Sequence, residues 1–417
     1  MGVPGGDARA RQAARRDPAR LTGRTFASLR RRNYRLYVTG QVLSTTGTWV
    51  QLVAEGWLVV RLTGSGLALG VTTALQFTPL LFLGAYGGLI VDRFDRRRLL
   101  VSTQLAAGAL AFTTGLLTTT GVIRVWMVFV AAFLLGCVNV FDSPGRQSFT
   151  RELVGEDVAN AVALNNAVAT GARFVGPAVG GALVASAGIA TCFLVNAASY
   201  AAVVAALVAI DVNELAIEER IARRRGQVRE GLRYVRSRRP LLVVLLMLAL
   251  TSAFGFNFQV LLPLLADSEF HRGGGTYGLL MSALGFGALL GSLVVAALPP
   301  ATPRRVAGFA FVVAAALFGL AASPTVAVAV PAAAFLGLSF SLFLASASGS
   351  LQVETAAGMR GRVMSLYSIG FLGTAPIGGP AVGAVAEAAG PRAGLLVGAV
   401  ASAAAGLLGI GLRRSAP

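Results

Sequence analysis

The sequence lacks residue types on which many catalytic sites depend. All 36 of its basic residues are arginine, and it has one histidine and two cysteines. Without lysine, the phosphate-binding motif GxxxxGK[ST] of ATP-driven proteins is excluded. His271 stands alone in the loop sequence DSEFHRGGG, which excludes a metal-binding histidine pair or a histidine-dependent catalytic triad within one chain. Cys137 and Cys192 lie in apolar segments and predict packing residues. We therefore expect no enzyme, no metal and no cofactor.

Charged residues are also scarce. They make up 13% of the 417 residues, whereas a typical soluble protein has roughly a quarter. Hydrophobic residues make up 55%, and the mean hydropathy is +0.71. Apolar segments of about twenty residues recur from end to end, and each is long enough to cross a hydrocarbon core of about 30 Å as a helix. Because lipid cannot satisfy backbone hydrogen bonds, such segments must be helical. The composition predicts an all-α membrane protein.

The apolar segments fall into two groups of six, separated by one long polar stretch at 211–240. We predict twelve transmembrane helices in two pseudo-symmetric six-helix bundles, at 34–210 and 241–412. Residues 1–33 predict a disordered basic tail, and 413–417 a short polar end. The twelve predicted segments are 35–61, 66–91, 99–120, 124–143, 159–186, 190–210, 241–262, 276–298, 305–322, 326–350, 363–387 and 393–412.

Arginine is distributed unevenly over the ends of these segments. With the N-terminus in the cytoplasm, 31 Arg fall on the cytoplasmic side, Arg146 and Arg151 among them, four fall on the other side, and Arg173 lies inside a helix. The asymmetry follows the positive-inside rule and predicts a cell-membrane protein with both termini in the cytoplasm. The net charge of +18 then faces anionic lipid, so we expect no nucleic-acid partner.

Part of the polar stretch predicts an amphipathic helix. In RIARRRGQVREGLRYVRSRRP, the apolar residues Ile221, Val228, Leu232 and Val235 share one helical face amid basic residues. Such a helix lies on the inner membrane surface. The alternative is a solvated linker.

The chain also repeats itself. GPAVG occurs at 176–180 and again at 379–383, and each copy is followed by a run of small residues that ends at Gly188 or Gly390. Equivalent placement in both halves favours a parallel repeat, which is typical of one transporter architecture with the substrate path between the halves.

The densest group of charges lies in GGLIVDRFDRRRLL, residues 87–100. Gly88, Asp92, Arg93, Arg96 and Arg97 follow the pattern of the loop between helices two and three in the major facilitator superfamily, which the chain resembles from about residue 30 to residue 412. The runs GQVLSTTGTWVQ, FDSPGRQ and RGRVMSLYSIG are similar to the branch with enterobactin-exporter-like and macrolide-efflux-like proteins.

The resemblance implies an inner gate. In relatives, the Asp of this loop and the Arg four residues later pair with an acidic residue on helix four, and here these positions are Asp92, Arg96 and Asp142. Such a charge cluster must break when the halves rock open, so it biases the equilibrium between two states. The alternative role of the arginines is to anchor the topology, which we expect for Arg97 and Arg98. Asp95 departs from the family pattern, which has glycine there.

A second motif, GARFVGPAVGG, resembles the helix-five motif of antiporters in the superfamily. It matches at Gly176, Pro177, Gly180 and Gly181. Glycine lets helices approach closely, and proline permits a bend. The resemblance favours export over import. The alternative is ordinary packing of small residues.

Two ionisable residues lie inside predicted helices, where charges are costly and usually functional. Glu55 is a candidate carrier of a coupling proton, or else a residue whose head group reaches the outer surface. Arg173 stays charged and is a candidate ligand for an anionic substrate group, or else a structural ion pair. Further candidates for a polar lining, each of which packing also explains, are Gln51, Gln76, Asn165, Asn166, Asn196, Asn257 and Gln259.

These observations predict a secondary transporter that exports small amphipathic molecules, such as drugs or siderophore-like metabolites, in exchange for protons by rocker-switch alternating access. The expected partners are a small-molecule substrate, the proton and the lipid bilayer, with the protein as a monomer. The alternatives are an importer or facilitator on the same fold, or a membrane sensor that does not transport.

Overall fold

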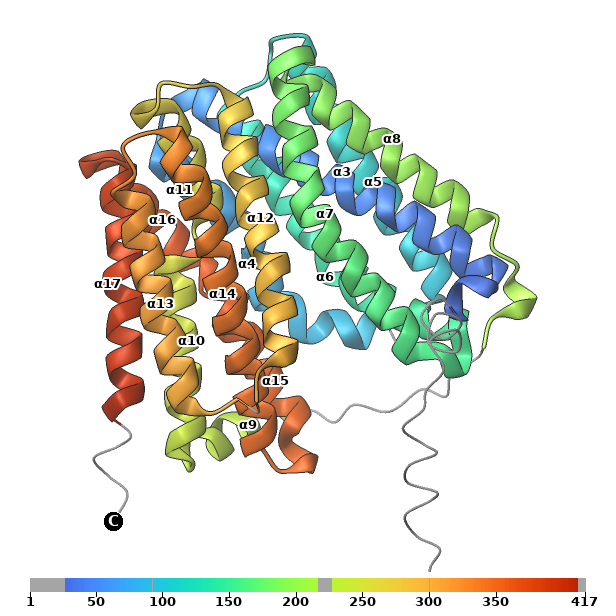
Figure 1. Ribbon diagram of the computed structural model, residues 1–417. Helices are drawn as coiled ribbons and strands as arrows, with labels where there is room; N and C mark the ends of the chain where they lie inside the picture. The colour runs from blue at the N-terminus through green and yellow to red at the C-terminus, as the bar shows by residue number, and fades with distance from the viewer. Residues whose placement is uncertain (1–26, 92, 217–226, 300, 412–417) are drawn as a thin grey trace, which may run out of the picture.

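The computed structural model describes residues 27–91, 93–216, 227–299 and 301–411, which are almost entirely helical (Figure 1). Predictions that concern residues 1–26, Asp92, 217–226, Pro300 and 412–417 lie outside the described residues. Eleven described segments are long and apolar enough to cross a membrane. The long helix α3 (Arg32–Thr63) is not among them, because polar residues such as Gln41, Gln51 and Glu55 lower its hydropathy.

The first half of the chain forms one bundle of six long helices. They are α3, α4 (Gly66–Val91), α5 (Arg96–Thr119), α6 (Val125–Val154), α7 (Val158–Ala187) and α8 (Ile189–Val208).

The second half forms a second bundle, in which two of the membrane-spanning segments are broken. The first broken segment consists of α10 (Arg239–Gly255), α11 (Phe258–Leu264) and the short π-helix η4 (Leu265–Glu269). The second consists of α15 (Arg360–Leu372) and α16 (Ala375–Ala389). The unbroken helices are α12 (Gly274–Ala297), α13 (Pro303–Ala321), α14 (Val326–Glu354) and α17 (Pro391–Ile410).

The predicted segments agree closely with these helices except at α6. The segment 66–91 coincides with α4, whereas 124–143 stops far short of the end of α6 at Val154. Arg146 and Arg151, which are counted above with the residues beyond the fourth membrane segment, therefore lie in a helix rather than in a loop. Pro144 lies inside α6 without ending it, so a proline among charges is not by itself the end of a membrane helix.

The internal repeat extends from sequence to backbone. Gly188 separates α7 from α8 with φ of +85°, and Gly390 separates α16 from α17 with φ of +86°. Both follow the GPAVG runs by equivalent lengths of chain. L-residues with a side chain rarely adopt this conformation, so both turns need glycine.

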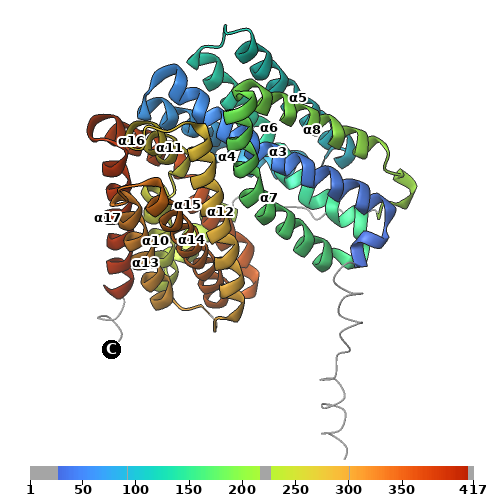
Figure 2. The same cartoon turned by 45° about the horizontal axis from the view of Figure 1, so that its top comes forward.

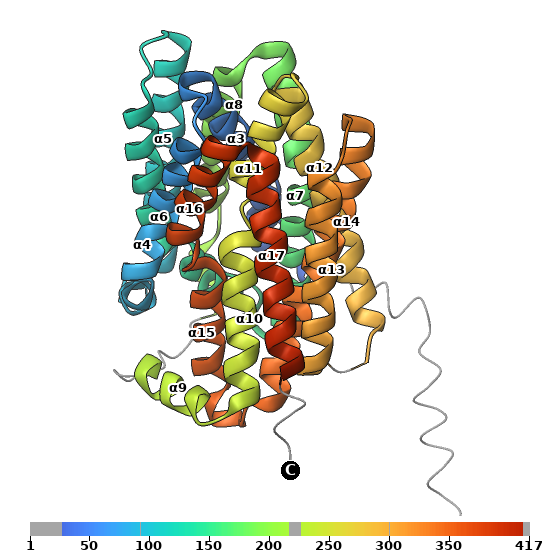
Figure 3. The ribbon, with the colours of Figure 1, turned by 90° about the vertical axis from the view of Figure 1, so that its left-hand side faces the viewer.

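The two bundles meet through two pairs of helices, α4 with α16 and α7 with α12 (Figures 2 and 3). We call the end of the molecule near Arg32, α9 (Gln227–Arg236) and Ile410 the tail face, and the end near Gly64, Gly188 and Gly390 the opposite face. In Figure 1, α7 and α12 lie side by side toward the opposite face and diverge toward the tail face. The molecule is therefore closed at the opposite face.

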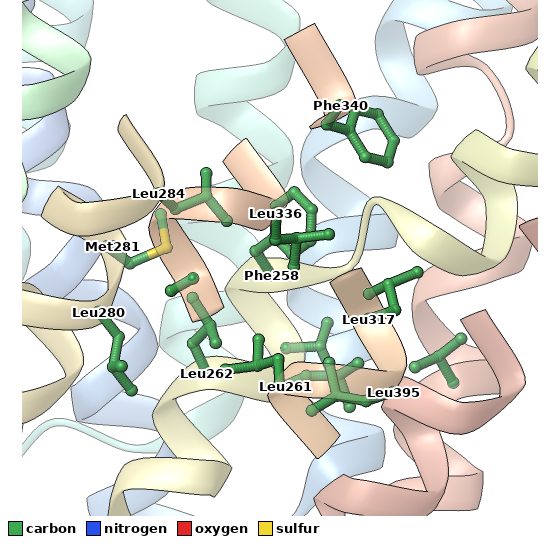
Figure 4. Close-up of a cluster of buried hydrophobic side chains, with 14 of the residues drawn as sticks. Phe258, Leu261, Leu262, Leu280, Met281, Leu284, Leu317, Leu336, Phe340 and Leu395 are labelled. Atoms are coloured by element: carbon green, nitrogen blue, oxygen red, sulfur yellow. The ribbon is translucent and has the colours of Figure 1, made fainter. Parts of the chain in front are cut away.

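The second bundle holds the largest apolar core. Leu261, Leu317, Leu336 and Leu395, each less than 2% exposed, bring together α11, α13, α14 and α17 (Figure 4). Phe256, at the break between α10 and α11, stacks on Phe258, Phe340 and Phe371 with ring centroids 5.0–5.2 Å apart. The aromatic contacts fill the space that the broken helix leaves.

The amphipathic helix predicted in the polar stretch is α9. It packs on α15 and α10 at the tail face, with Val235 buried and Leu232 exposed. Glu230 pairs with Arg362, and the Tyr234 hydroxyl accepts a hydrogen bond from the Ala356 amide. One end of the apolar face therefore docks on the second bundle.

Candidate functional site

A polar pocket lies between α3, α4, α6 and α11, where the two bundles meet. The cavity itself is small, about 50 Å³, and it opens to the space outside. Amide and hydroxyl side chains share its wall with leucines. The lining residues are Thr48, Gln51, Leu52, Glu55, Gly56, Leu69, Thr72, Thr73, Gln76, Leu135 and Gln259.

Glu55 is the one ionisable residue among this lining. Its side chain is half-buried in α3. The neighbouring Gln51 is oriented by α8, because its Oε1 accepts a hydrogen bond of 2.7 Å from the Asn196 amide. Thr48 lies 3.4 Å from the Tyr200 hydroxyl. The pocket therefore offers a carboxylate beside oriented polar groups, which suits a proton, a cationic group or a hydrogen-bonding ligand.

Three of the polar candidates from the sequence, Gln51, Gln76 and Gln259, line this pocket. Asn196 does not line the pocket itself but donates a hydrogen bond to Gln51. Asn257, at the break between α10 and α11, instead donates its side-chain amide to the Ala253 carbonyl of α10, at 2.7 Å. Asn165 donates to Thr150 at 3.2 Å. The sequence could not separate these roles.

Arg173 does not line the pocket. Its guanidinium carbon lies 5.3 Å from the centre of the Trp49 ring, and the residue is exposed. Within the described residues Arg173 has no ion pair, so the alternative of a structural ion pair is not supported there. A cation over an indole face keeps its charge available to a ligand.

A second polar cluster lies inside the first bundle, nearer the tail face. Asp142 of α6 is 6% exposed and accepts hydrogen bonds from Thr103 and Gln104 of α5 at 2.9 and 2.7 Å. It also pairs with Arg146 one turn later, and Arg146 donates to Gln41 of α3. The pair joins three helices, and charges held in this way satisfy each other away from water.

The residues of the loop motif make local contacts in this structure. Arg96 pairs with Glu152 at the end of α6, and Arg97 donates to the Leu207 and Val208 carbonyls at the end of α8, both at 2.7 Å. Arg97 therefore caps a helix, a role beyond the topology anchor expected for it. Gly88 lies in the last turns of α4 and Arg93 is exposed.

The structure shows why Asp95 can stand where the family pattern has glycine. It is the N-cap of α5 and accepts a hydrogen bond of 2.7 Å from the Arg98 amide. Asp and Gly are both favoured at N-caps, so the replacement keeps the helix start.

The predicted gate of Asp92, Arg96 and Asp142 is not assembled among the described residues. Arg96 is engaged with Glu152, and Asp142 with Arg146. Asp92 lies outside the described residues, so the gate stays a prediction.

The helix-five glycines lie at two different contacts. A Cβ at Gly176 would lie 2.4 Å from Trp49 Cβ, and one at Gly180 would lie 3.0 Å from the Val50 carbonyl, both on α3 of the same bundle. A Cβ at Gly181 would lie 2.8 Å from the Gly278 Cα on α12 of the other bundle. Pro177 is buried between them. This part of the motif lets α7 pack tightly on both bundles.

The repeated copy of the motif closes the other contact between the bundles. A Cβ at Gly383 would lie 2.3 Å from the Gly66 carbonyl oxygen on α4. One turn later, the Glu387 carboxylate accepts hydrogen bonds from the Ser65 hydroxyl and, at 3.0 Å, from the Leu67 amide. A carboxylate at the first turn of α4 satisfies an otherwise free amide and the helix dipole. Glu387 thus ties the second bundle to the first at the opposite face.

Sequence reasoning missed Arg146 and Glu387 as parts of these clusters. The spacing of four between Asp142 and Arg146 is a signal that was available, because such residues meet on one helix face. Glu387 has no such signal, since its partners lie more than 300 residues away.

Solved structures share this arrangement. The nucleoside transporter NupG superposes with a TM-score of 0.75 at 14% identity, covering 92% of this chain and 100% of that one. A bacterial homologue of the iron transporter ferroportin, in an inward-facing state, has a TM-score of 0.70 at 16% identity, covering 92% and 99%. The fold is therefore that of a major facilitator transporter, and the predicted all-α membrane fold is confirmed.

The chain belongs to the transmembrane secretion effector family of this superfamily, which matches residues 23–415. It is 26% identical to the multidrug efflux pump Tap of Mycobacterium tuberculosis (strain ATCC 25618 / H37Rv), over 90% of this chain and 92% of Tap. It is 24% identical to the staphyloferrin A transporter of Staphylococcus aureus (strain NCTC 8325 / PS 47), over 62% and 66%. A shorter match, 26% over 28% of this chain and 29% of the relative, is to macrolide efflux protein A of Streptococcus pyogenes. The protein is a multi-pass membrane transporter of small molecules and not an enzyme, as the sequence predicts.

Proposed function

We propose that this transporter exports small amphipathic molecules in exchange for protons, with Glu55 as the group that binds the coupling proton. The observation that carries the proposal is the position of Glu55 as the one ionisable side chain lining a pocket at the meeting point of the bundles. A carboxylate can hold either a proton or a polar group of a substrate, and competition for one site couples the two fluxes.

The pocket lining supports an amphipathic substrate. Leu52, Leu69 and Leu135 offer apolar surface, while the glutamines and threonines offer donors and acceptors. Small-molecule sites commonly combine apolar walls with a few placed polar groups. The relatives named as efflux pumps support export.

The direction requires the tail face to be cytoplasmic. The arginine-rich ends of α5, α9, α10, α13 and α15 all lie at that face, in accord with the positive-inside rule. A molecule that is closed at the opposite face then faces inward. The gate of Asp92, Arg96 and Asp142 would assemble in the other state, when the tail face closes and Arg96 leaves Glu152.

Transport into proteoliposomes with an imposed proton gradient tests the proposal, with ethidium and erythromycin as probes. We expect gradient-driven accumulation by the wild type and a loss of at least about tenfold in Glu55→Gln, equivalent to roughly 1.4 kcal/mol. Glu230→Gln is the matched control, because it neutralises an exposed carboxylate on α9 and should transport normally. Unchanged gradient dependence in Glu55→Gln would contradict the assignment of the proton to this residue.

A further inference from the structure

Tyr277 of α12 has a buried hydroxyl with no hydrogen-bond partner among the described residues. The side chain is 0% exposed. A buried polar group without a partner costs about 1–3 kcal/mol, and such a group in a native structure calls for an explanation. The hydroxyl therefore lacks an acceptor until a neighbouring side chain turns toward it.

The hydroxyl lies against the wall of the pocket. A Cβ added at Gly56 would lie 3.0 Å from the Tyr277 oxygen and 3.3 Å from its ring. Gly56 lines the pocket and follows Glu55 directly in α3. A side chain at this position would crowd the ring, which would then have to shift by a few tenths of an ångström.

Glu55 is the one carboxylate of the pocket, and it directly precedes Gly56, whose backbone lies against the Tyr277 ring. The pocket residues contributed by α3, α4, α6 and α11 are otherwise neutral. Arg61, the next charged residue along α3, is exposed and lies about 9 Å further along the helix axis. A hydrogen bond between them requires the Glu55 side chain to turn toward the hydroxyl.

The two residues belong to different bundles. Tyr277 lies in the first turn of α12, which packs on Gly56 and Trp57 of α3 near the opposite face. When the opposite face opens, α12 moves away from α3 and carries the hydroxyl with it. The donor is therefore next to Glu55 in one state of the transport cycle and absent in the other.

We infer that Tyr277 is a positioning residue for proton release: its hydroxyl donates to the ionised Glu55 carboxylate while the opposite face is closed, and withdraws when that face opens. The inference rests on the proposed role of Glu55. A donor stabilises the ionised form, so the carboxylate gives up its proton more readily while the tail face is the open side. The affinity of Glu55 for a proton then differs between the state open at the tail face and the state open at the opposite face. Coupled exchange needs such a difference.

The test measures protonation of Glu55 directly in the purified protein. Infrared difference spectra are recorded during a pH titration, and the Glu55 band is the protonated-carboxyl signal that Glu55→Gln removes. Tyr277→Phe keeps the ring and deletes the donor, so we expect the midpoint of this band to move upward by about one pH unit. Tyr367→Phe is the control, because the hydroxyl of Tyr367 already donates to the Leu344 carbonyl at 3.4 Å. Its titration should match the wild type.

Three further results decide the inference. In the Glu55→Gln background, Tyr277→Phe should cause no further change in the pH profile of ethidium transport. Site-specific 3,5-difluorotyrosine at position 277, a stronger donor of nearly the same shape, should move the midpoint downward and serves if Tyr277→Phe does not fold. A Glu55 midpoint that neither substitution moves overturns the inference and leaves the proposed function standing. If Glu55→Gln keeps both the infrared band and the proton-coupled transport, the proposed function itself is wrong.

Discussion

Asp142, which is buried, and Arg146, which is half-buried, carry opposite charges one turn apart in α6. Thr103, Gln104 and Gln41 supply the remaining hydrogen bonds of the pair. The two charges are stable there because each satisfies the other, and removing one leaves the other buried without compensation. The pair is therefore a structural joint of the first bundle in this state, and Asp142 would have to leave it to enter the predicted gate.

This arrangement makes a prediction about stability. Asp142→Asn should lower the free energy of unfolding by about 3 kcal/mol, because Arg146 loses its counter-charge. Glu230→Gln removes the partner of Arg362 in an exposed pair and should lower it by less than about 1 kcal/mol. Denaturant unfolding of the purified protein in detergent compares the two variants. Equal losses would show that burial contributes nothing to the Asp142–Arg146 pair.

At the scale of elements, backbone contact between α4 and α16 decides how the bundles close. Gly66 and Gly383 face each other so closely that neither carries room for a methyl group, and Glu387 caps the start of α4 from one turn away. Apolar side chains at this crossing would hold the helices apart. The small residues therefore allow the polar contact, since the carboxylate reaches the Leu67 amide only when the helices touch.

We predict that Gly383→Ala shifts the molecule toward opening at the opposite face. The added Cβ would lie 2.3 Å from a backbone oxygen, which cannot rotate away. Spin labels at the exposed residues Leu62 and Ala388, with both native cysteines replaced by serine, report the separation by double electron–electron resonance. A longer-distance population should appear and grow by roughly tenfold for each 1.4 kcal/mol of lost contact energy.

Gly308→Ala is the control for this substitution. Gly308 lies in α13, and a Cβ there would meet nothing within 4 Å. The same pair of labels should give the wild-type distribution. If Gly383→Ala also left the distances unchanged, the α4–α16 crossing would not govern closure.

At the scale of the whole molecule, the two faces differ in charge and in packing. The opposite face is held by glycine contacts and by Glu387, whereas α7 and α12 separate toward the tail face (Figure 1). A rocking motion that closes one face opens the other. The same motion would exchange the partners of Arg96 and separate Tyr277 from α3, so gate, proton site and closure respond together.

The orientation of the molecule can be tested independently of transport. In a background with both native cysteines replaced, cysteine at Ser237 of the tail face should react with a membrane-impermeant maleimide only in inside-out vesicles. Cysteine at Thr120, at the opposite face, should react only in intact cells. Both residues are exposed. The reverse pattern would place the termini outside and contradict an exporter driven by inward proton flow.

Much of the fold can be predicted because the membrane imposes local rules. Every crossing segment must be apolar, helical and about twenty residues long, so the range 66–91 coincides with α4. The repeat of GPAVG likewise marks two equivalent helices whose ends, Gly188 and Gly390, have the same backbone conformation. Charge asymmetry adds a predicted orientation. Each of these conclusions needs only the order of residues along the chain and not which side chains meet.

Which side chains meet is a different matter, because a helix in lipid is apolar on most sides and its sequence does not show which face packs on which neighbour. Arg96 pairs with Glu152, and Glu387 accepts a hydrogen bond from the start of α4. Tyr277 lies against Gly56, which lines the pocket. The partners come from segments far apart in the chain or from the other bundle. Those contacts exist only once the helices have packed, and they depend on the state in which the two bundles rest.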